Sequence, residues 1–138
     1  MRYGYCRVST QKQNIERQVR NIKNNYNDAV IVQEAYTGTK VEGRKEFNKL
    51  LKAVKKDDTI IFDSVSRMSR NADEGYKLYE SLFNRGINLV FIKEPHINTE
   101  TYKKALDNNI KLTGTNVDFI LEGVNKYLLA LAKEQIKI

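Results

Sequence analysis

The amino-acid sequence predicts an α/β domain: a mostly parallel sheet of four or five strands flanked by helices. Two observations support this fold class. Within residues 1–96, short apolar runs typical of strands alternate with amphipathic helical patterns in the order βαβαβαβ. In one of these runs, Val30, Ile31 and Val32 are contiguous, as expected where helices cover both faces of a sheet. Parallel strands joined by helices in this way adopt right-handed crossovers.

The boundaries of the elements follow from the same patterns, taken in chain order. Alternating residues rich in Tyr and Val predict the first strand, and apolar residues three or four positions apart predict each helix. Gly86 is expected just past the end of the third helix, where glycine is favoured. The expected strands cover residues 2–8, 30–35, 59–62 and 88–93, and the expected helices cover residues 11–26, 44–56 and 72–85.

The pattern changes after Pro95. We expect a short helix over residues 99–106, a loop over residues 108–114 and a long final helix from Thr115 onward. That last helix is apolar on more than one side, so it either closes the core of its own domain or packs against a second subunit. The chain is therefore interpreted as one domain, residues 1–138, with an α/β core (1–96), a connecting segment (97–114) and a long helix (115–138).

The composition of the chain limits which binding partners and which cellular location are expected. Lys and Arg total 24 against 17 Asp and Glu, a net charge of +7 that favours nucleic acid, although a lysine-rich surface alone gives the same balance. The single cysteine, Cys6, cannot form an internal disulfide, and neither a secretory signal nor a membrane-spanning run is visible, so we expect a cytoplasmic protein. Glycine-rich nucleotide motifs are absent and His96 has no nearby metal-ligand partner, so neither a nucleotide cofactor nor a metal is expected.

Polar residues follow the ends of three expected strands: Ser9 the first, residues 37–43 the second and residues 63–71 the third. In parallel sheets, ligands bind beyond the carboxyl ends of the strands, so these segments should line one edge. Arg7 and Ser9 share a face of their strand because they are two residues apart. Thr10 begins the next helix, and helix amino-termini favour anions. These features indicate phosphate chemistry at Ser9, although a serine in this position is more often a helix cap.

Two further arginines, Arg67 and Arg70, lie three residues apart and so share one side of a helical turn. Guanidinium groups match the geometry of phosphate, and three of them around one hydroxyl can stabilise charge that develops on a phosphodiester without a metal. The simpler interpretation is a solvated basic turn. The position of the pair after a strand end favours the phosphate site.

The segment YCRVSTQKQ, from Tyr5 to Gln13, resembles the amino-terminal signature of the serine recombinases (resolvase/invertase family), and SRMSRN, from Ser66 to Asn71, resembles the second motif of that family. The resemblance extends over nearly the whole chain. It implies a resolvase-like fold with a long C-terminal helix. It also implies an enzyme of site-specific DNA recombination, in which Ser9 attacks a DNA phosphodiester, forms a 5′-phosphoserine bond and frees a 3′-hydroxyl before strand exchange and religation.

The resemblance implies roles for individual residues. Arg7, Arg67 and Arg70 bind and stabilise the phosphate around the nucleophile Ser9. Many family members carry Asp where this chain has Ser66, so the proton donor and acceptor stay unassigned. The residues with implied supporting or DNA-phosphate roles are Gln13, Gln18, Asp58, Arg44 and Ser66.

By the same resemblance, the partner is double-stranded DNA, and the chain forms homodimers that pair into tetramers through the C-terminal helix, with no cofactor. Family members carry a separate DNA-binding domain beyond that helix, so the chain is expected to be a catalytic fragment or a recombinase without its DNA-reading part. Two other interpretations stay open: a non-catalytic, DNA-associated assembly module with the same fold, and a small phosphate-ligand protein with a flavodoxin-like sheet. The sequence does not distinguish integration, inversion, resolution and transposition.

Overall fold

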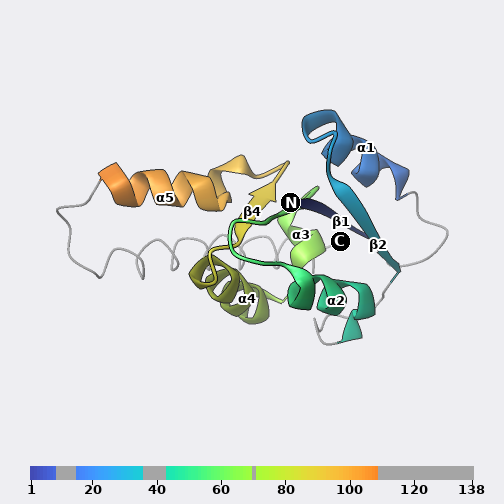
Figure 1. The fold of residues 1–138 in the computed structure, drawn as a ribbon. Coiled ribbons are helices and arrows are strands. Elements are labelled where there is room, and N and C mark those ends of the chain that lie inside the picture. Colours follow the sequence, from blue (N-terminus) through green and yellow to red (C-terminus); the bar gives the residue numbers. More distant parts are fainter. Residues whose placement is uncertain (9–14, 36–42, 70, 109–138) are drawn as a thin grey trace.

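The computed structural model describes residues 1–8, 15–35, 43–69 and 71–108. In these residues four strands form one sheet in the spatial order β2-β1-β3-β4, and every neighbouring pair is parallel. This confirms the predicted parallel α/β architecture (Figure 1). The strands are β1 (Arg2–Val8), β2 (Val30–Ala35), β3 (Thr59–Phe62) and β4 (Asn88–Phe91).

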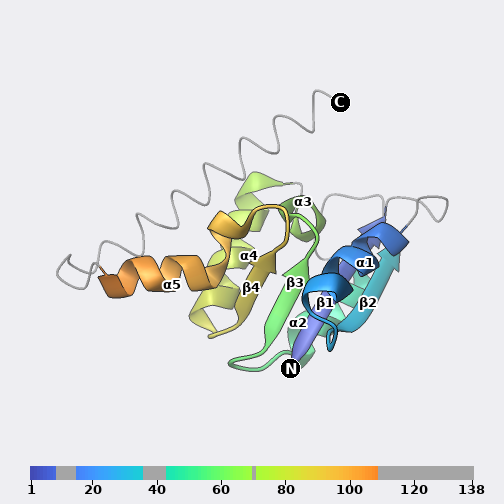
Figure 2. The ribbon, with the colours of Figure 1, turned by 90° about the horizontal axis from the view of Figure 1, so that it is seen from above.

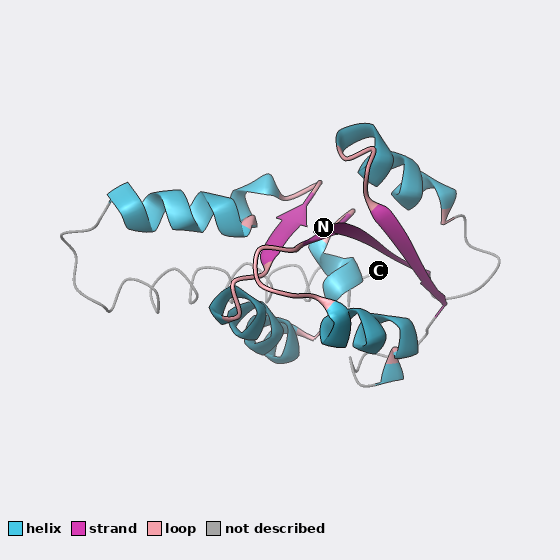
Figure 3. Ribbon diagram, in the orientation of Figure 1, coloured by secondary structure: helices cyan, strands magenta, loops and turns pink. Residues whose placement is uncertain are grey.

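Helices cover both faces of this sheet, which Figure 3 shows as a layer between them. α1 (Glu16–Asn25) lies on one face, whereas α2 (Lys45–Ala53) and α4 (Ala72–Asn84) lie on the other. All three correspond to helices that the apolar periodicity predicts, although α2 ends before the expected boundary at residue 56.

The remaining described helices differ more from the sequence pattern. The helical turn expected to carry both Arg67 and Arg70 is shorter than that: α3 (Val65–Met68) contains Arg67 but ends before Arg70, because Ser69 is extended. A 3₁₀ turn, η2 (Pro95–Ile97), is not predicted by the sequence pattern. The short helix expected after Pro95 is confirmed as α5 (Thr99–Asn108). The long helix expected over residues 115–138 lies outside the described residues, as does the start of the helix expected from residue 11.

The face covered by α2 and α4 carries the larger core. Aromatic rings pack across it, with Phe47 of α2 centred 4.6 Å from Tyr5 of β1, and Phe62 of β3 stacked at 5.3 Å on Phe91 of β4. Such ring pairs stabilise a core beyond the area that they bury. These contacts join α2 and the strands β1, β3 and β4 in one hydrophobic core cluster.

The opposite face is closed by α1. Ile22 of this helix packs so closely on β1 that a Cβ atom at Gly4 would lie 2.8 Å from the Ile22 Cγ2 atom. Cys6, two residues along the strand, is fully buried in the same cluster. Because side chains alternate along a strand, Tyr5 and Arg7 then lie on the other face, toward α2 and α3.

The two edge strands are β2 and β4. The contiguous apolar residues of β2 suggest burial on both faces, but β2 is an edge strand and its first residue, Val30, is 44% exposed. The free edge of β4 is covered by side chains that precede or begin α5, which lies beside it (Figure 2). Leu89 N–H donates to Thr99 Oγ1 at 2.9 Å, and Phe91 N–H donates to Asn98 Oδ1 at 2.7 Å.

Since all four strands run parallel, their carboxyl ends meet at one edge of the sheet. β1 ends there at Val8, and β3 ends there at Phe62. The helix α3 begins at Val65, three residues after the end of β3. Gly86 lies at the opposite, amino edge with φ of +78°, and follows α4 as predicted. The carboxyl edge is therefore the place where the expected site residues should gather.

Candidate active site

Arg7 lies near the carboxyl end of β1, and only 3% of it is exposed. β3 pairs with β1 only as far as Tyr5, and beyond this point a side chain of α1 binds the strand. Gln18 Oε1 accepts from Arg7 N–H at 3.0 Å, and Gln18 Nε2 donates to Arg7 C=O at 2.8 Å. Gln18 therefore holds the end of the strand that leads to Ser9, which agrees with a supporting role.

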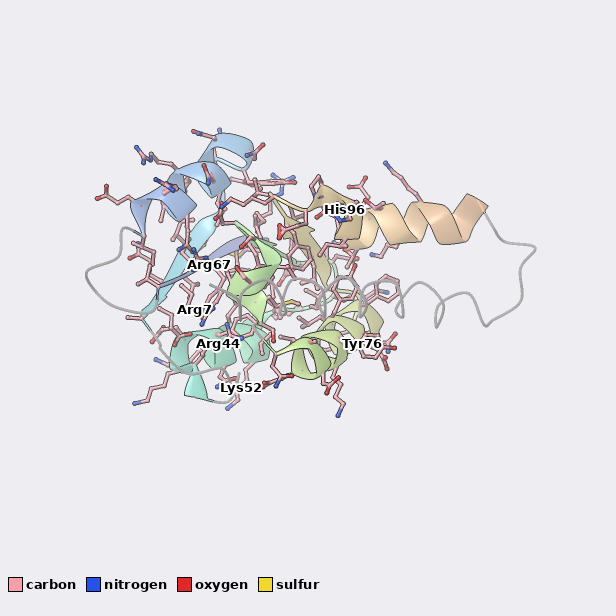
Figure 4. The ribbon with its side chains drawn as sticks, turned by 180° about the vertical axis from the view of Figure 1, so that it is seen from behind. Arg7, Arg44, Lys52, Arg67, Tyr76 and His96 are labelled. Atoms are coloured by element: carbon pink, nitrogen blue, oxygen red, sulfur yellow. The ribbon has the colours of Figure 1, made fainter. Side chains whose placement is uncertain are left out.

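The second half of the expected site lies on α3. Arg67 and Ser66 belong to this helix, and both side chains are half-buried. Arg7 Nη2 donates to the Ser66 carbonyl at 2.9 Å, so the end of β1 is joined directly to α3. The Ser66 hydroxyl shares a hydrogen bond of 2.8 Å with that of Ser64. In Figure 4, Arg7, Arg67 and Arg44 lie near one another, although they come from distant parts of the chain.

The backbone of α3 is bound at both ends by buried charged side chains. At its start, Val65 N–H donates to Glu94 Oε1 at 2.8 Å. At its end, Arg44 Nη1 donates to the Arg67 carbonyl at 2.8 Å, and Arg44 Nη2 donates to the Met68 carbonyl. The orientation of the helix that carries Arg67 thus depends on residues from two other segments.

Of the two roles that the resemblance implies for Arg44, supporting the site or binding DNA phosphate, its position favours the supporting one. Arg44 immediately precedes α2 and is 2% exposed, with its guanidinium directed into the fold. The guanidinium carbon lies 4.4 Å from the centre of the Phe47 ring, and the N–H groups of its fork bind the two carbonyls of α3. Its charge is committed to the protein backbone rather than presented at the surface.

A further buried network lies behind Arg44. The Tyr5 hydroxyl donates to Glu34 Oε1 at 2.6 Å and accepts a long hydrogen bond, 3.5 Å, from Arg44 Nη1. The Glu34 carboxylate also accepts from the N–H groups of Glu46 and Phe47 in the first turn of α2, at 2.9 and 3.2 Å. Burial, reinforced by the hydrogen bond to Glu34, raises the pKa of the Tyr5 phenol well above its usual value, so the phenol stays a proton donor.

The structure places Asp58 away from the other expected site residues. It precedes β3 and so lies at the amino edge of the sheet, opposite α3. Its carboxylate accepts from the Met1 amino group at 3.1 Å and from Lys55 N–H at 2.9 Å. The expectation of an acidic group near the phosphate site is therefore wrong for Asp58, whose contacts join the first residue of the chain to the turn before β3.

Two other ionisable groups near the site, Asp63 and Cys6, are buried in contacts that indicate a structural role. Asp63 is 1% exposed, accepts from Asn21 Nδ2 at 2.7 Å and pairs with Lys93 Nζ at 3.3 Å. Burial, with a smaller contribution from the Asp63 charge, raises the pKa of the Cys6 thiol to about 12. The thiol is protonated at neutral pH and is no nucleophile, which agrees with a packed strand residue.

Sequence reasoning missed the roles of Glu34 and Glu94. Both are more than nine-tenths buried, although glutamate is rarely buried without a partner. The available signal was their position: Glu34 lies inside the strand β2, and Glu94 comes three residues after the end of the apolar strand β4. A buried carboxylate requires hydrogen-bond donors. Glu34 accepts from an N–H group at the start of α2, and Glu94 accepts from one at the start of α3.

Ser9, Gln13 and Arg70 lie outside the described residues, so their positions stay predictions. Within the described ranges, no helix is long and apolar enough to cross a membrane, and no group of three His, Cys, Asp or Glu side chains is arranged to hold a metal ion. A cavity of about 280 Å³ lies at the amino edge, between Arg2, Asn88 and neighbouring residues, and so is separate from the arginines.

Comparison with known proteins identifies the family. Residues 2–134 match the family model described as the resolvase N-terminal domain. The chain belongs to the resolvase family of serine recombinases. The transposon Tn21 resolvase of Escherichia coli is 34% identical over 93 residues, which is 67% of this chain and 47% of that protein. The Tn1721 resolvase of Escherichia coli is 28% identical over 141 residues, or 97% of this chain and 71% of that protein. This resolvase domain thus spans about half the length of the first relative.

Solved structures show the same fold. The N-terminal catalytic domain of TP901-1 integrase superimposes with a TM-score of 0.62 at 20% identity, covering 94% of this resolvase domain and 97% of that chain. A resolvase family site-specific recombinase from Streptococcus pneumoniae superimposes with a TM-score of 0.54 at 22% identity, covering 91% and 97%. The four-stranded parallel sheet with its flanking helices is therefore a resolvase-like fold.

Proposed function

We propose that this resolvase domain catalyses the breakage and rejoining of double-stranded DNA in site-specific recombination, with Ser9 as the nucleophile. The observation that carries the proposal is the hydrogen bond between Arg7 and the backbone of α3. It joins the strand that leads to Ser9 to the helix that carries Arg67, and so brings two cationic segments to one edge of the sheet. Guanidinium groups in a partly buried setting attract a phosphate more strongly than they do in water.

In the proposed reaction, the Ser9 hydroxyl oxygen attacks the phosphorus of a DNA phosphodiester. The serine oxygen–phosphorus bond forms, the bond from phosphorus to the 3′-oxygen breaks, and the serine proton leaves while the 3′-oxygen gains a proton. Arg7, Arg67 and Arg70 stabilise the negative charge that develops on the phosphate oxygens. The phosphoserine bond conserves the energy of the broken bond, so the 3′-hydroxyl of a new strand can reverse the step without ATP.

This chemistry also determines the proposed assembly. Recombination between two duplexes breaks four strands, and each protein copy supplies one Ser9. We therefore infer a homodimer at each site and a tetramer across two sites, formed through the helix predicted over residues 115–138. DNA as substrate is consistent with the net charge of +7 and with a cytoplasmic location.

Covalent capture tests the proposal. The protein is incubated with a pool of randomised duplex DNA that carries 3′-bridging phosphorothiolate linkages, because a sulfur leaving group rejoins poorly and traps the intermediate. The mixture is denatured, and mass spectrometry then locates the modified residue. The unaltered protein should give an adduct on Ser9, and Ser9→Ala should give none while retaining its circular dichroism spectrum. Ser81→Ala is the matched control, because Ser81 is exposed on α4 away from the carboxyl edge.

The outcomes separate the interpretations. An adduct that survives Ser9→Ala excludes Ser9 as the nucleophile. DNA binding without any adduct of the unaltered protein contradicts the enzyme and favours the DNA-associated assembly module.

A further inference from the structure

The helix α3 cannot be stable by itself. It has four residues, whereas isolated helices shorter than about 12 residues are marginal in water. Its preceding residue, Ser64, makes no side-chain cap to the first turn. The N–H groups at the start and the carbonyls at the end therefore depend on partners from elsewhere. Since α3 carries Arg67, whatever supplies those partners also sets the position of that side chain.

A negative charge binds the start of α3. Glu94, three residues after the end of β4, accepts from Val65 N–H at 2.8 Å and is 6% exposed. Its second oxygen, Oε2, is buried and makes no hydrogen bond to the residues that the structure describes. A carboxylate at a helix amino-terminus is favourable because of the exposed N–H groups and the helix dipole. Glu94, from the segment between β4 and η2, thus supplies the cap that Ser64 does not provide.

Positive charges bind the end of α3. Arg44 donates to the carbonyls of Arg67 and Met68, and Arg7 donates to that of Ser66. Arg7 and Arg44 are both more than nine-tenths buried. The three last carbonyls of the turn are therefore all bound by guanidinium groups, which is the favourable sign for a helix carboxyl-terminus.

The position of Arg44 is itself determined by a buried acid. Arg44 is the residue before the first turn of α2, and Glu34 binds the N–H groups of Glu46 and Phe47 in that turn. The same carboxylate accepts from the Tyr5 hydroxyl of β1. The strand β1, the start of α2 and the end of α3 are thereby joined through hydrogen bonds to charged groups, which are stronger than neutral ones.

We propose that Glu94 and Arg44 are positioning residues of the active site, which hold the two ends of α3 so that Arg67 is presented to the DNA phosphate. This inference rests on the proposed function, since it takes Arg67 to act on phosphate. The sequence interpretation assigns no role to Glu94. For Arg44 it gives a supporting or DNA-phosphate role, and the present proposal specifies how the residue supports the site. Neither side chain touches the substrate; both act through the backbone of α3.

Burying these charges has a desolvation cost, which their hydrogen bonds to α3 offset. An unsatisfied carboxylate oxygen such as Glu94 Oε2 adds to that cost. Removing one charged partner leaves the other groups buried without it, so a loss of stability is expected for either role. Substituting a residue retained only for folding would lower the rate only as far as stability falls, whereas substituting a positioning residue lowers the rate beyond that. This difference separates the two roles experimentally.

The test uses Arg44→Lys and Glu94→Gln in the full chain, each with a matched control. Lysine keeps the charge of Arg44 but lacks the fork that reaches two carbonyls. Its control is Arg85→Lys, because Arg85 also donates to two carbonyls, those of Leu51 and Val54 at the end of α2. The control for Glu94→Gln is Glu100→Gln, an exposed residue of α5.

Two measurements are made on each variant. The first is the rate of Ser9–DNA adduct formation against DNA concentration. At saturating DNA we expect a loss of about tenfold for Arg44→Lys, because one strong hydrogen bond is worth about that factor, and a smaller loss of about fivefold for Glu94→Gln, which keeps a weaker acceptor. The DNA concentration that gives half the maximal rate should change less than about twofold, because the substituted groups do not contact DNA.

The second measurement is the amide signal of Val65 in ¹⁵N-edited NMR spectra, recorded as the pH is varied. Ionisation of Glu94 should move this signal in the unaltered protein, and the movement should be absent in Glu94→Gln. This readout does not depend on catalysis. If the unaltered protein forms no adduct, the proposed function fails, and the Val65 signal alone then decides whether Glu94 holds α3.

The following results would overturn the inference. Rates for Arg44→Lys and Glu94→Gln that equal those of Arg85→Lys and Glu100→Gln would show that α3 needs neither residue. Rate losses that merely follow the loss of unfolding free energy, as in Arg85→Lys, would show a role in folding only. A pH-dependent Val65 signal that persists in Glu94→Gln would show that Glu94 does not bind the start of α3.

Discussion

Replacing Tyr5 by Phe removes one hydroxyl from the network behind the candidate site. That hydroxyl donates to Glu34 at 2.6 Å, and both residues are buried. A hydrogen bond to a charged group contributes about 1.5–3 kcal/mol. The Glu34 carboxylate keeps its two N–H donors from α2, so the variant should fold with a free energy of unfolding lower by about 2 kcal/mol, near the middle of that range.

Urea unfolding followed by circular dichroism measures this loss. For a domain of this size, about 2 kcal/mol corresponds to a decrease in Tm of roughly 8 °C. Tyr79→Phe is the matched comparison, because the Tyr79 hydroxyl is also buried and donates at 2.6 Å, but to the neutral carbonyl of Ile97. A neutral hydrogen bond contributes about 1 kcal/mol, so the Tyr79 variant should lose about half as much.

The comparison tests whether the charged partners of the Tyr5 hydroxyl, Glu34 and more distantly Arg44, add to stability. If Tyr5→Phe costs no more than Tyr79→Phe, these partners add nothing, and the reasoning about charge-assisted contacts around α2 and α3 is refuted. A change in the urea m-value of only one variant would show instead that its unfolded state, rather than its hydrogen bond, has changed.

Three other predictions concern the sheet and the buried ionisable groups. Gly4→Ala places a Cβ atom 2.8 Å from the Ile22 Cγ2 atom, so urea unfolding should show a loss of about 1–3 kcal/mol. Because the pKa of Cys6 is raised to about 12, its thiol should resist alkylation by iodoacetamide at pH 8 until urea unfolds the chain. Burial raises the pKa of Glu94 above its ordinary value of 4.5, so the folded chain binds this proton more tightly than the unfolded chain. The free energy of unfolding should therefore fall as pH rises from 4.5 through the raised pKa, and Glu94→Gln should remove that fall in a urea series at stepped pH.

The strands and the larger helices could be predicted because their residues carry a period. Alternation with two tyrosines and Val8 defines β1, and apolar residues at helical spacing define α4. A helix of four residues is too short to show such a period, so the bounds of α3, which ends before Arg70, could not be predicted. The order of strands was also beyond the sequence pattern, and without it the exposed position of Val30 on an edge strand could not be foreseen.

For the site, topology was a better guide than resemblance. The rule that ligands bind at the carboxyl ends of parallel strands predicted that Arg7 and Arg67 lie at one edge. The same rule excludes Asp58, which precedes a strand, but the resemblance alone suggested it. Nothing in the residues around Arg44 shows that its side chain points inward, since burial of an arginine depends on carbonyls that come from a distant segment.

The covered edge of β4 limits how copies of this protein can associate. An open strand edge offers a row of N–H and C=O groups on which another chain can add a strand, the usual start of fibrous aggregation. Asn98 and Thr99 already bind two of the outward N–H groups of β4. Addition of a further strand at this edge would first have to displace α5, so a high local concentration of the protein does not create a template for stacking there.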